Sequence, residues 1–174
     1  YVYYAQNGSR RRLPNGNENS LNLNAVNHSN SVQYSFPIAD NTVGFIADNN
    51  LYRSTNLQNA FPIWTKLADY NTAIVRLHSA LNGTKNLFAI ADDKKIYRYT
   101  DYSDASLTPT ILTAPINTNL YADITTVSND TKVLYLSAGT RVYRSDDEGQ
   151  TWTNISVGLP TVNIIKLIHD VYST

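Results

Sequence analysis

Two short acidic runs are the residues of this chain best suited to general acid–base chemistry. They are Asp92–Asp93 and Asp146–Glu148. Glycoside hydrolysis uses a pair of carboxyl groups, and the separation of the pair decides its stereochemical outcome. Both runs fall in predicted turns, where aspartate accepts hydrogen bonds from nearby main-chain amides. The sequence therefore favours a structural role for these carboxylates over a catalytic one.

The other reactive side chains do not form a catalytic or metal-binding set. His28, His78 and His169 are far apart, and none has a second ligand residue at metal-binding spacing. The chain has no cysteine, no Gly-x-Ser-x-Gly nucleophile turn and no glycine-rich phosphate loop. We therefore expect no catalytic residues, no metal and no cofactor, and a chain that is not an enzyme.

Length and charge limit the partners of the chain. Its 174 residues include 14 basic and 14 acidic side chains, so no net field attracts nucleic acid. No apolar run approaches the roughly 18 residues of a transmembrane helix. We expect a globular chain that binds no nucleic acid and does not insert into a membrane.

The chain repeats itself. A phrase of an apolar residue, tyrosine and arginine recurs after 45 and then 46 residues, as Leu51–Arg53, Ile96–Arg98 and Val142–Arg144. Each copy follows an apolar run that ends in a short polar break, which is the pattern of a β-hairpin. Strand-like runs also lie upstream and downstream of each hairpin, so each repeat predicts four short antiparallel strands. Because tyrosine and arginine alternate, we expect the tyrosines to pack against the adjacent repeat.

This repeat predicts an all-β protein with the architecture of a β-propeller. A four-stranded unit of about 45 residues cannot cover both faces of its sheet alone, and stacking units around an axis supplies the cover. A β-sandwich is the alternative, but it gives no reason for one phrase to recur at one spacing. We expect about three complete blades of four strands, with partial blades at both ends.

The repeat also sets the predicted boundaries. Residues 1–30 form a partial blade and an Asn-rich loop, and residues 31–174 form the blades, with repeats at about 31–70, 71–115 and 120–160 and a partial repeat over 161–174. Within the last, residues 163–169 predict the first strand of a further blade, whereas Tyr1–Ala5 resembles a second strand. The chain is therefore either a window from a larger propeller, which we favour, or a four-bladed ring whose ends share one blade.

The third repeat contains a recognisable loop motif. Ser145, Asp147, Gly149, Thr151 and Trp152 fit the pattern S-x-D-x-G-x-T-W at every fixed position. This resembles the Asp-box, or BNR repeat, of sialidases, sortilin-type receptors and xyloglucan-degrading enzymes, and such propellers are common among secreted bacterial proteins. The resemblance implies a structural fastener. Asp147 would accept amides of the turn, Gly149 would supply positive φ, and Trp152 would plug the turn onto the sheet.

The other repeats keep only parts of this motif. The first repeat has Ser54 and Trp64 with a longer insert between them, and the second has Thr100 and Asp101. The resemblance to the Asp-box is therefore strong in the third repeat and loose in the other two.

One further element resembles a sialidase. Arg12–Pro14 is similar to the aromatic-Arg-Ile-Pro element whose arginine binds the substrate carboxylate in that family, although Arg11 stands in the aromatic position. The remaining sialidase residues have no match in the sequence. Arg12 is therefore kept as a ligand candidate, and a solvated basic turn is the preferred interpretation of residues 10–14.

These observations favour a non-catalytic segment of an extracellular or cell-surface β-propeller. It would bind a protein or glycan partner through its loops and central face, as part of a larger chain or assembly. The alternative is a part of a sialidase- or xyloglucanase-like glycoside hydrolase whose catalytic residues lie largely outside these residues. A third possibility is a spacer without a ligand. Fold by itself does not decide among them.

Overall fold

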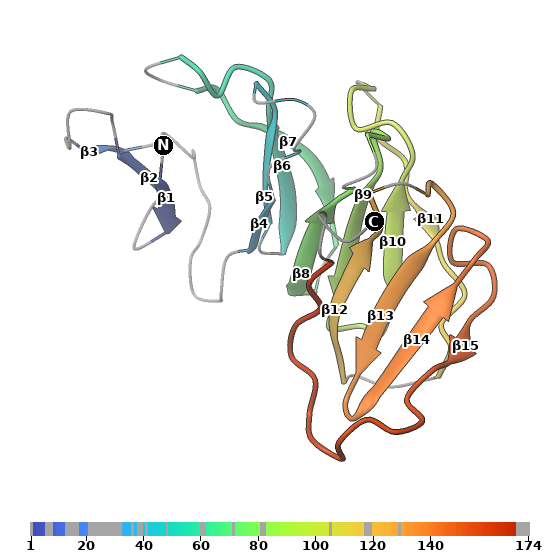
Figure 1. Cartoon of the computed structure of the whole chain (residues 1–174). Coiled ribbons are helices and arrows are strands. Elements are labelled where there is room, and N and C mark those ends of the chain that lie inside the picture. Colours follow the sequence, from blue (N-terminus) through green and yellow to red (C-terminus); the bar gives the residue numbers. More distant parts are fainter. Residues whose placement is uncertain are drawn as a thin grey trace.

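The structure is a computed structural model of the whole chain. It describes residues 2–5, 9–12, 18–20, 33–35, 37, 40, 42–47, 49–59, 62–70, 72–80, 83–104, 106–116, 120–128 and 130–169. In residues 2–20 and at residue 34 the main chain alone is described. All regular elements in these ranges are β-strands (Figure 1). None of the described segments is a helix of the length and apolar character needed to cross a membrane.

Three antiparallel sheets of four strands form the body of the molecule. In each sheet the strands follow one another in chain order. The first blade is β4 (Gln33–Ser35), β5 (Gly44–Ala47), β6 (Asn50–Ser54) and β7 (Thr65–Asp69); the second is β8 (Ile74–Ser79), β9 (Leu87–Ala91), β10 (Ile96–Tyr99) and β11 (Thr110–Ile111); the third is β12 (Tyr121–Thr126), β13 (Leu134–Ala138), β14 (Arg141–Ser145) and β15 (Thr153–Asn154). The predicted all-β fold of four-stranded blades is confirmed.

The recurring phrase occupies the same place in each blade. Its tyrosine and arginine lie side by side on the third strand, and in every blade the arginine pairs with a threonine of the fourth strand. These pairs are Arg53 with Thr65, Arg98 with Thr110 and Arg144 with Thr153. The sequence repeat therefore corresponds to a repeated pairing of the third and fourth strands in every blade.

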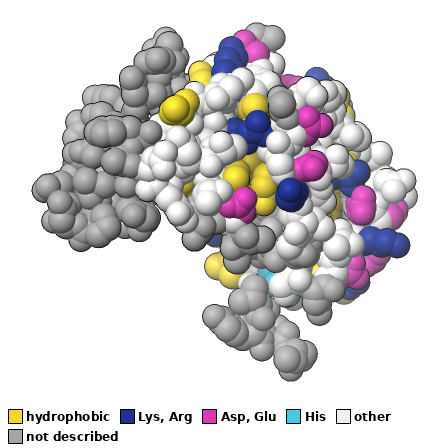
Figure 2. All heavy atoms as spheres, turned by 90° about the horizontal axis from the view of Figure 1, so that it is seen from above, with side chains coloured by type: hydrophobic (Ala, Val, Ile, Leu, Met, Phe, Trp, Pro, Cys, Tyr) yellow, Lys and Arg dark blue, Asp and Glu magenta, His cyan; other side chains and the backbone are white. Residues whose placement is uncertain are grey.

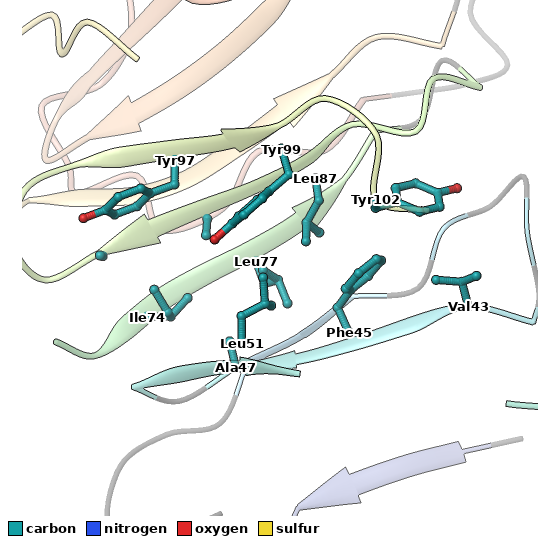
Figure 3. Packing of buried hydrophobic residues seen from close by; sticks show 12 residues of the cluster. Val43, Phe45, Ala47, Leu51, Ile74, Leu77, Leu87, Tyr97, Tyr99 and Tyr102 are labelled. Atoms are coloured by element: carbon teal, nitrogen blue, oxygen red, sulfur yellow. The ribbon is translucent and has the colours of Figure 1, made fainter. Parts of the chain in front are cut away.

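Apolar side chains fill the two spaces between successive blades. Phe45, Ala47 and Leu51 of the first blade pack against Ile74 and Leu87 of the second, together with Tyr97 and Tyr99 (Figure 3). A second cluster joins the second and third blades, with Phe88, Ile90 and Ile96 on one side and Ile124, Leu136 and Tyr143 on the other. Tyr97 and Tyr143 each pack toward the preceding blade, as alternation along a strand predicts.

The N-terminal part forms a separate three-stranded sheet. Its strands are β1 (Val2–Ala5), β2 (Ser9–Arg12) and β3 (Glu18–Ser20), in the order β1-β2-β3. The expectation of a basic turn at residues 10–14 was wrong for Arg10–Arg12, because these residues pair with both β1 and β3 as the middle strand. Within the predicted Asn-rich loop, residues 18–20 are strand, and residues 21–30 lie outside the described residues.

The strand expected at residues 163–169 is not formed. The main-chain amide of Ile164 donates to the carbonyl of Gly139 at 2.8 Å, and that of Leu167 donates to the Asp123 carboxylate at 2.8 Å. The side chains of Ile165 and Ile168 are 79% and 83% exposed. The segment lies against the third blade, but within the described residues no neighbouring strand pairs with it, so it has no ladder.

Candidate functional site

The loop of residues 145–152, here called the Asp-box-like loop, joins β14 to β15 and is held by its own side chains. The Ser145 hydroxyl donates to Asp147 Oδ1 at 2.7 Å and accepts the Gly149 amide at 2.8 Å. Asp147 accepts the Thr151 amide on Oδ1 at 2.8 Å and the Thr151 hydroxyl on Oδ2 at 2.6 Å. The carboxylate thus satisfies polar groups of a turn that have no strand partner.

These hydrogen bonds also set the acidity of the carboxyl group. The Thr151 hydroxyl, the Thr151 amide and the Ser145 hydroxyl stabilise the charged form and lower the pKa of Asp147 to about 2. A carboxyl group with this pKa stays ionised at neutral pH. It therefore accepts hydrogen bonds and is a poor proton donor there.

Gly149 and Trp152 fit the loop against its surroundings. Gly149 has a φ of +87°, and a Cβ at this position would lie 2.7 Å from a methyl carbon of Leu112. The indole N–H of Trp152 donates to the carbonyl of Thr113 at 2.8 Å, and its ring packs on the cluster between the second and third blades. The tryptophan thus fastens the loop to the neighbouring blade as well as to its own sheet.

The acidic runs that suggested paired carboxylates are engaged in ion pairs. Glu148 accepts from Arg98 at 2.8 Å, and Asp146 accepts from Arg144 at 2.6 Å. In the other run, Asp93 pairs with a lysine at 2.8 Å and accepts the hydroxyl of Tyr97 at 2.8 Å. These contacts give Asp93, Asp146 and Glu148 structural partners.

The first blade repeats the serine–carboxylate contact with an asparagine that sequence reasoning missed. The Ser54 hydroxyl donates to Asn56 Oδ1 at 2.9 Å, and the same oxygen accepts the Ile63 amide at 2.8 Å. Asn56 thus does for its loop what Asp147 does in the third blade. Asn56 follows Ser54 by two residues, as Asp147 follows Ser145, and this shared spacing could have identified it. The long insert before Ile63 concealed the similarity.

The second blade lacks this fastener. Register places Tyr99, and not Thr100, at the position of Ser145, so the hydroxyl that would bind the carboxylate is absent. Asp101 instead accepts the amide and the hydroxyl of Ser103 at 2.9 and 2.8 Å, which closes a local turn.

An arginine on the third strand of one blade reaches the loop of the next. Arg53 Nη1 donates to the carbonyl of Tyr102 at 2.5 Å, and Arg98 Nη1 donates to the carbonyl of Glu148 at 3.1 Å. Tyr102 and Glu148 hold equivalent positions, since each donates its own amide to the carbonyl of a lysine two residues before the second strand of its blade. We call this contact the arginine clasp.

Polar side chains line the first strands of the blades, which adjoin one another along the axis. Ser35 bonds Ser79 between β4 and β8 at 2.8 Å, and Arg76 Nε donates to Asp123 between β8 and β12 at 2.5 Å. Asp123 is buried and also accepts the amide of Leu167, as described above. His169, on the same C-terminal segment, lies 3.2 Å from the hydroxyl of Ser128. We call these first-strand residues and the segment 163–169 the axial row.

His78 belongs to the axial row and is held in its neutral form. Its Nε2 accepts the amide of Thr126 at 3.3 Å. Burial lowers the pKa of His78 to about 4, with Asp123 acting in the opposite direction and Arg76 and Lys166 adding to the decrease. Lys166 itself is exposed.

The remaining candidates are not brought into this arrangement. Arg12 lies on β2, opposite Val2 and Glu18, and its side chain is outside the described residues, as is His28. In the part of the chain that is described, no three histidine or acidic side chains are placed to hold a metal ion. On the face drawn in Figure 2, acidic and basic side chains are interspersed, in keeping with the balanced composition.

Known structures share this fold at low sequence identity. No family model and no curated protein matches the chain. The structure of U3-55K is 14% identical over 73% of this chain and 37% of its own, with a TM-score of 0.57. YCF48 from Cyanidioschyzon merolae is 16% identical over 74% and 41% of the two chains, with a TM-score of 0.58. The GH74 enzyme of Niastella koreensis is 17% identical over 70% and 17%, with a TM-score of 0.51.

This chain therefore spans less than half the length of each of these three proteins. Identities at this level show the fold alone. By its blades, their register and these neighbours, the chain has the fold of a β-propeller segment.

Proposed function

We propose that this chain is a non-catalytic binding or scaffold module of an extracellular or cell-surface β-propeller, with a protein or glycan as its partner. The observation that carries the proposal is that the polar groups of the loops and those of the axial row have different roles. Carboxylates of the loops are engaged by structural partners, whereas the axial row places the exposed Lys166 beside the buried polar groups of the first strands. Asn163 and Lys166 are exposed polar side chains of this row, and His169 is half-buried.

A row of this kind suits recognition better than proton transfer. Neighbouring first strands hold Arg76 and Asp123 of this row on rigid elements, and binding sites gain from such preorganisation. The pair of Arg76 and Asp123 fixes two charges in place, and Lys166 adds an exposed positive charge beside them. Hydrogen-bonding groups on several strands are compatible with either a peptide or a sugar.

The second candidate is a part of a glycoside hydrolase. The GH74 enzyme is one of the structures that share the fold, and this neighbour is the observation that favours the candidate. Under this alternative the catalytic residues lie largely outside these residues, and Arg12 is the one site residue that the chain would contribute.

The test is a ligand search followed by two matched variants. The chain is screened on a glycan array and in pull-down experiments, and any ligand is titrated against Lys166→Ala and Lys66→Ala. Lys66 is an exposed lysine on β7, at the outer edge of the first blade. We expect the axial variant to weaken binding by roughly tenfold, the loss of one charge-assisted contact, and the control to bind as the parent does.

Equal binding by the two variants would contradict an axial site, and the absence of any ligand would favour a spacer. Hydrolysis of a sialoside or of xyloglucan by the chain, abolished in Arg12→Ala, would overturn the non-catalytic assignment.

A further inference from the structure

The repeated arginine of the third strand has a different set of partners in each blade. Arg98 donates from Nη1 to a carboxylate oxygen of Glu148 at 2.8 Å, in the loop of the next blade. Arg144 donates from Nε and Nη2 to Asp146 Oδ1 at 2.9 and 2.6 Å, in its own loop. The arginines of the second and third blades therefore each have a carboxylate partner.

Arg53, the arginine of the first blade, has no carboxylate partner in the described residues. Both positions that supply one elsewhere hold a neutral residue. Thr55 stands two residues after Arg53, where the third blade has Asp146, and Tyr102 takes the position that Glu148 holds one blade later. The acceptors of Arg53 are two main-chain carbonyls, and its Nη1 donates to both. Within the part of the chain that is described, Nε and Nη2 make no hydrogen bond, so this edge of the guanidinium can take a further acceptor.

A small hollow beside Arg53 is lined by hydrogen-bond donors. Its volume is about 220 Å³, and its lining residues are Arg53, Thr55, Asn56, Ile63 and Thr65. The side-chain oxygen of Asn56 is used within the loop, which leaves its amide nitrogen without a partner among the described residues. Both threonines are exposed. A guanidinium edge, an amide nitrogen and two hydroxyls together suit an anionic acceptor.

The donors of this hollow are held in place before any ligand arrives. Arg53 lies on β6 and pairs with Thr65 at the start of β7. The arginine clasp fixes its guanidinium, because two carbonyls of the second blade accept from Nη1 at 2.5 and 2.6 Å. Asn56 is fixed by its bonds to Ser54 and Ile63. Such preorganisation lowers the entropy cost of binding.

Two aspartates lie near Arg53, and neither carboxylate forms an ion pair with it in the residues that are described. Asp101 is close enough to interact electrostatically with Arg53, but its carboxylate accepts the amide and the hydroxyl of Ser103. Asp104 gives Arg53 its main-chain carbonyl, while its carboxylate accepts from Ser106. These negative charges oppose a ligand that carries several anionic groups. The hollow therefore suits a single carboxylate.

Other arginines of this chain show which group fills the open edge. In the third blade, Nε and Nη2 of Arg144 bind the side chain of Asp146. In the second blade, the same two nitrogens of Arg76 bind the carboxylate of Asp123, at 2.5 and 3.3 Å. The planar guanidinium fork matches a carboxylate in this geometry. In both cases the occupant is an acidic side chain of a polypeptide.

We propose that the hollow at Arg53 binds an acidic side chain of a protein partner, with its carboxylate on Nε and Nη2 of Arg53 and beside the donors of Asn56, Thr55 and Thr65. The site lies on the third and fourth strands of a blade, whereas the axial row lies on first strands. It is therefore a second site, and it does not depend on Lys166.

The test is a titration of the full chain, followed through the Nε–H signal of Arg53 in nitrogen–proton correlation spectra. The signal is assigned by its loss in Arg53→Lys. The probe is acetyl-Gly-Asp-Gly-amide, and acetyl-Gly-Asn-Gly-amide is its neutral counterpart. We expect a saturable shift and a dissociation constant about tenfold lower for the Asp peptide, because only this peptide forms the charge-assisted pair. No saturable shift, or equal affinity for the two peptides, would overturn the proposal.

Thr55→Asp fills the guanidinium edge from within, as Asp146 does in the third blade. We expect it to weaken binding of the Asp peptide about tenfold, through competition for the same donors. Thr161→Asp adds the same charge at an exposed threonine beyond β15 and should bind as the parent does. Equal affinities of the two variants would contradict a site at Arg53.

Thr65→Val is a second variant that adds no charge and removes one hydroxyl from the hollow. It should weaken binding roughly threefold, as expected for one neutral hydrogen bond, and unchanged affinity would contradict the placement of the ligand. Circular dichroism verifies that each variant is folded, so this result decides the matter if Thr55→Asp does not fold.

Two further titrations separate this site from the alternatives. A glucuronate-containing disaccharide that bound more tightly than the Asp peptide, with the binding lost in Thr55→Asp, would overturn the assignment to a protein partner. Lys166→Ala should leave the affinity for the Asp peptide unchanged. A loss of affinity in Lys166→Ala would place the peptide at the axial row and overturn the proposal, so failure here is distinguishable from failure of the axial site.

Discussion

At the scale of single residues, the loop after β14 shows how a short polar motif fixes a turn. Asp147 and Ser145 share their hydrogen bonds with Gly149 and Thr151, and the conformation they hold requires a positive φ at Gly149. Asn56 reproduces the same contacts in the first blade with a neutral side chain. Holding the turn therefore requires a side-chain oxygen that accepts hydrogen bonds, and the negative charge of Asp147 strengthens these bonds.

Asp147→Ala should lower the midpoint of thermal unfolding, because the Thr151 amide and the Ser145 hydroxyl lose their acceptor. Asp147→Asn should lower it less, since it keeps one oxygen, as Asn56 does. The folded pKa of about 2 lies below the usual 3.8. The contribution of the charge is therefore present above about pH 4 and is lost as the pH falls toward the folded pKa. As the pH falls over this range, the midpoint of thermal unfolding should therefore decrease less in Asp147→Asn than in the parent.

Gly149→Ala should destabilise the protein by about 2–4 kcal/mol, through left-handed backbone strain and overpacking. The added Cβ would lie 2.7 Å from Leu112 Cδ1 and 3.3 Å from Leu134 Cδ1. Gly158 is the control, because its φ is +84° and a Cβ there meets nothing within 4 Å. Denaturant melts that give equal losses for the two alanine variants would argue against close packing at Gly149.

At the scale of elements, the third strand of each blade presents two different faces. Tyr97 and Tyr143 pack toward the preceding blade, and Arg53 and Arg98 reach the following one. Strand alternation provides both faces in three residues. One short phrase thus specifies contacts with both neighbours, which explains why it recurs at the period of the blade.

Arg98→Ala should cost about 1–3 kcal/mol of stability, the range for a hydrogen bond to a charged group. It removes the bonds to the carbonyl and the carboxylate of Glu148. Arg98→Lys should give an intermediate loss, because an ammonium keeps the charge but not the planar geometry. Arg141→Ala, an exposed change on β14, should be nearly neutral in the same denaturant melts. A neutral result for Arg98→Ala would show that the clasp contributes little to the interface.

At the scale of the whole molecule, the blades meet along the axial row, where polar groups are buried. His78 lies among them with a pKa of about 4, below the usual 6.5 for histidine. Between these values the unfolded chain binds a proton that the folded chain does not. Folding stability is therefore lost as the pH falls from about 6.5 toward 4, and the loss stops below the folded value.

His78→Gln should remove this part of the acid sensitivity. The parent should lose at most about 1.4 kcal/mol per pH unit from this group between about pH 6.5 and 4, and the variant should show a flatter profile there. Urea melts at several pH values measure the difference. The Asp147 contribution falls in the lower window, so Asp147→Asn should leave the slope between pH 6.5 and 4 unchanged, and parallel profiles for parent and His78→Gln would contradict the assignment.

The sequence by itself determined the blades and the loop. The recurrence of apolar-Tyr-Arg fixed the period, and strand alternation fixed which face each side chain takes, because both are local properties of a β-strand. The contacts of Ser145, Asp147 and Thr151 follow from a spacing of a few residues, which a single turn brings together.

Only the tertiary structure decided what lies between blades. The acceptors of Arg53 and Arg98, the pair of Arg76 and Asp123, and the role of Asn56 join residues separated by inserts or by a whole blade. The segment 163–169 has the residues of a strand but no ladder in the described residues, because a strand forms only where a neighbour offers main-chain partners. Such partners are set by the packing of blades, and no local pattern in the sequence records that packing.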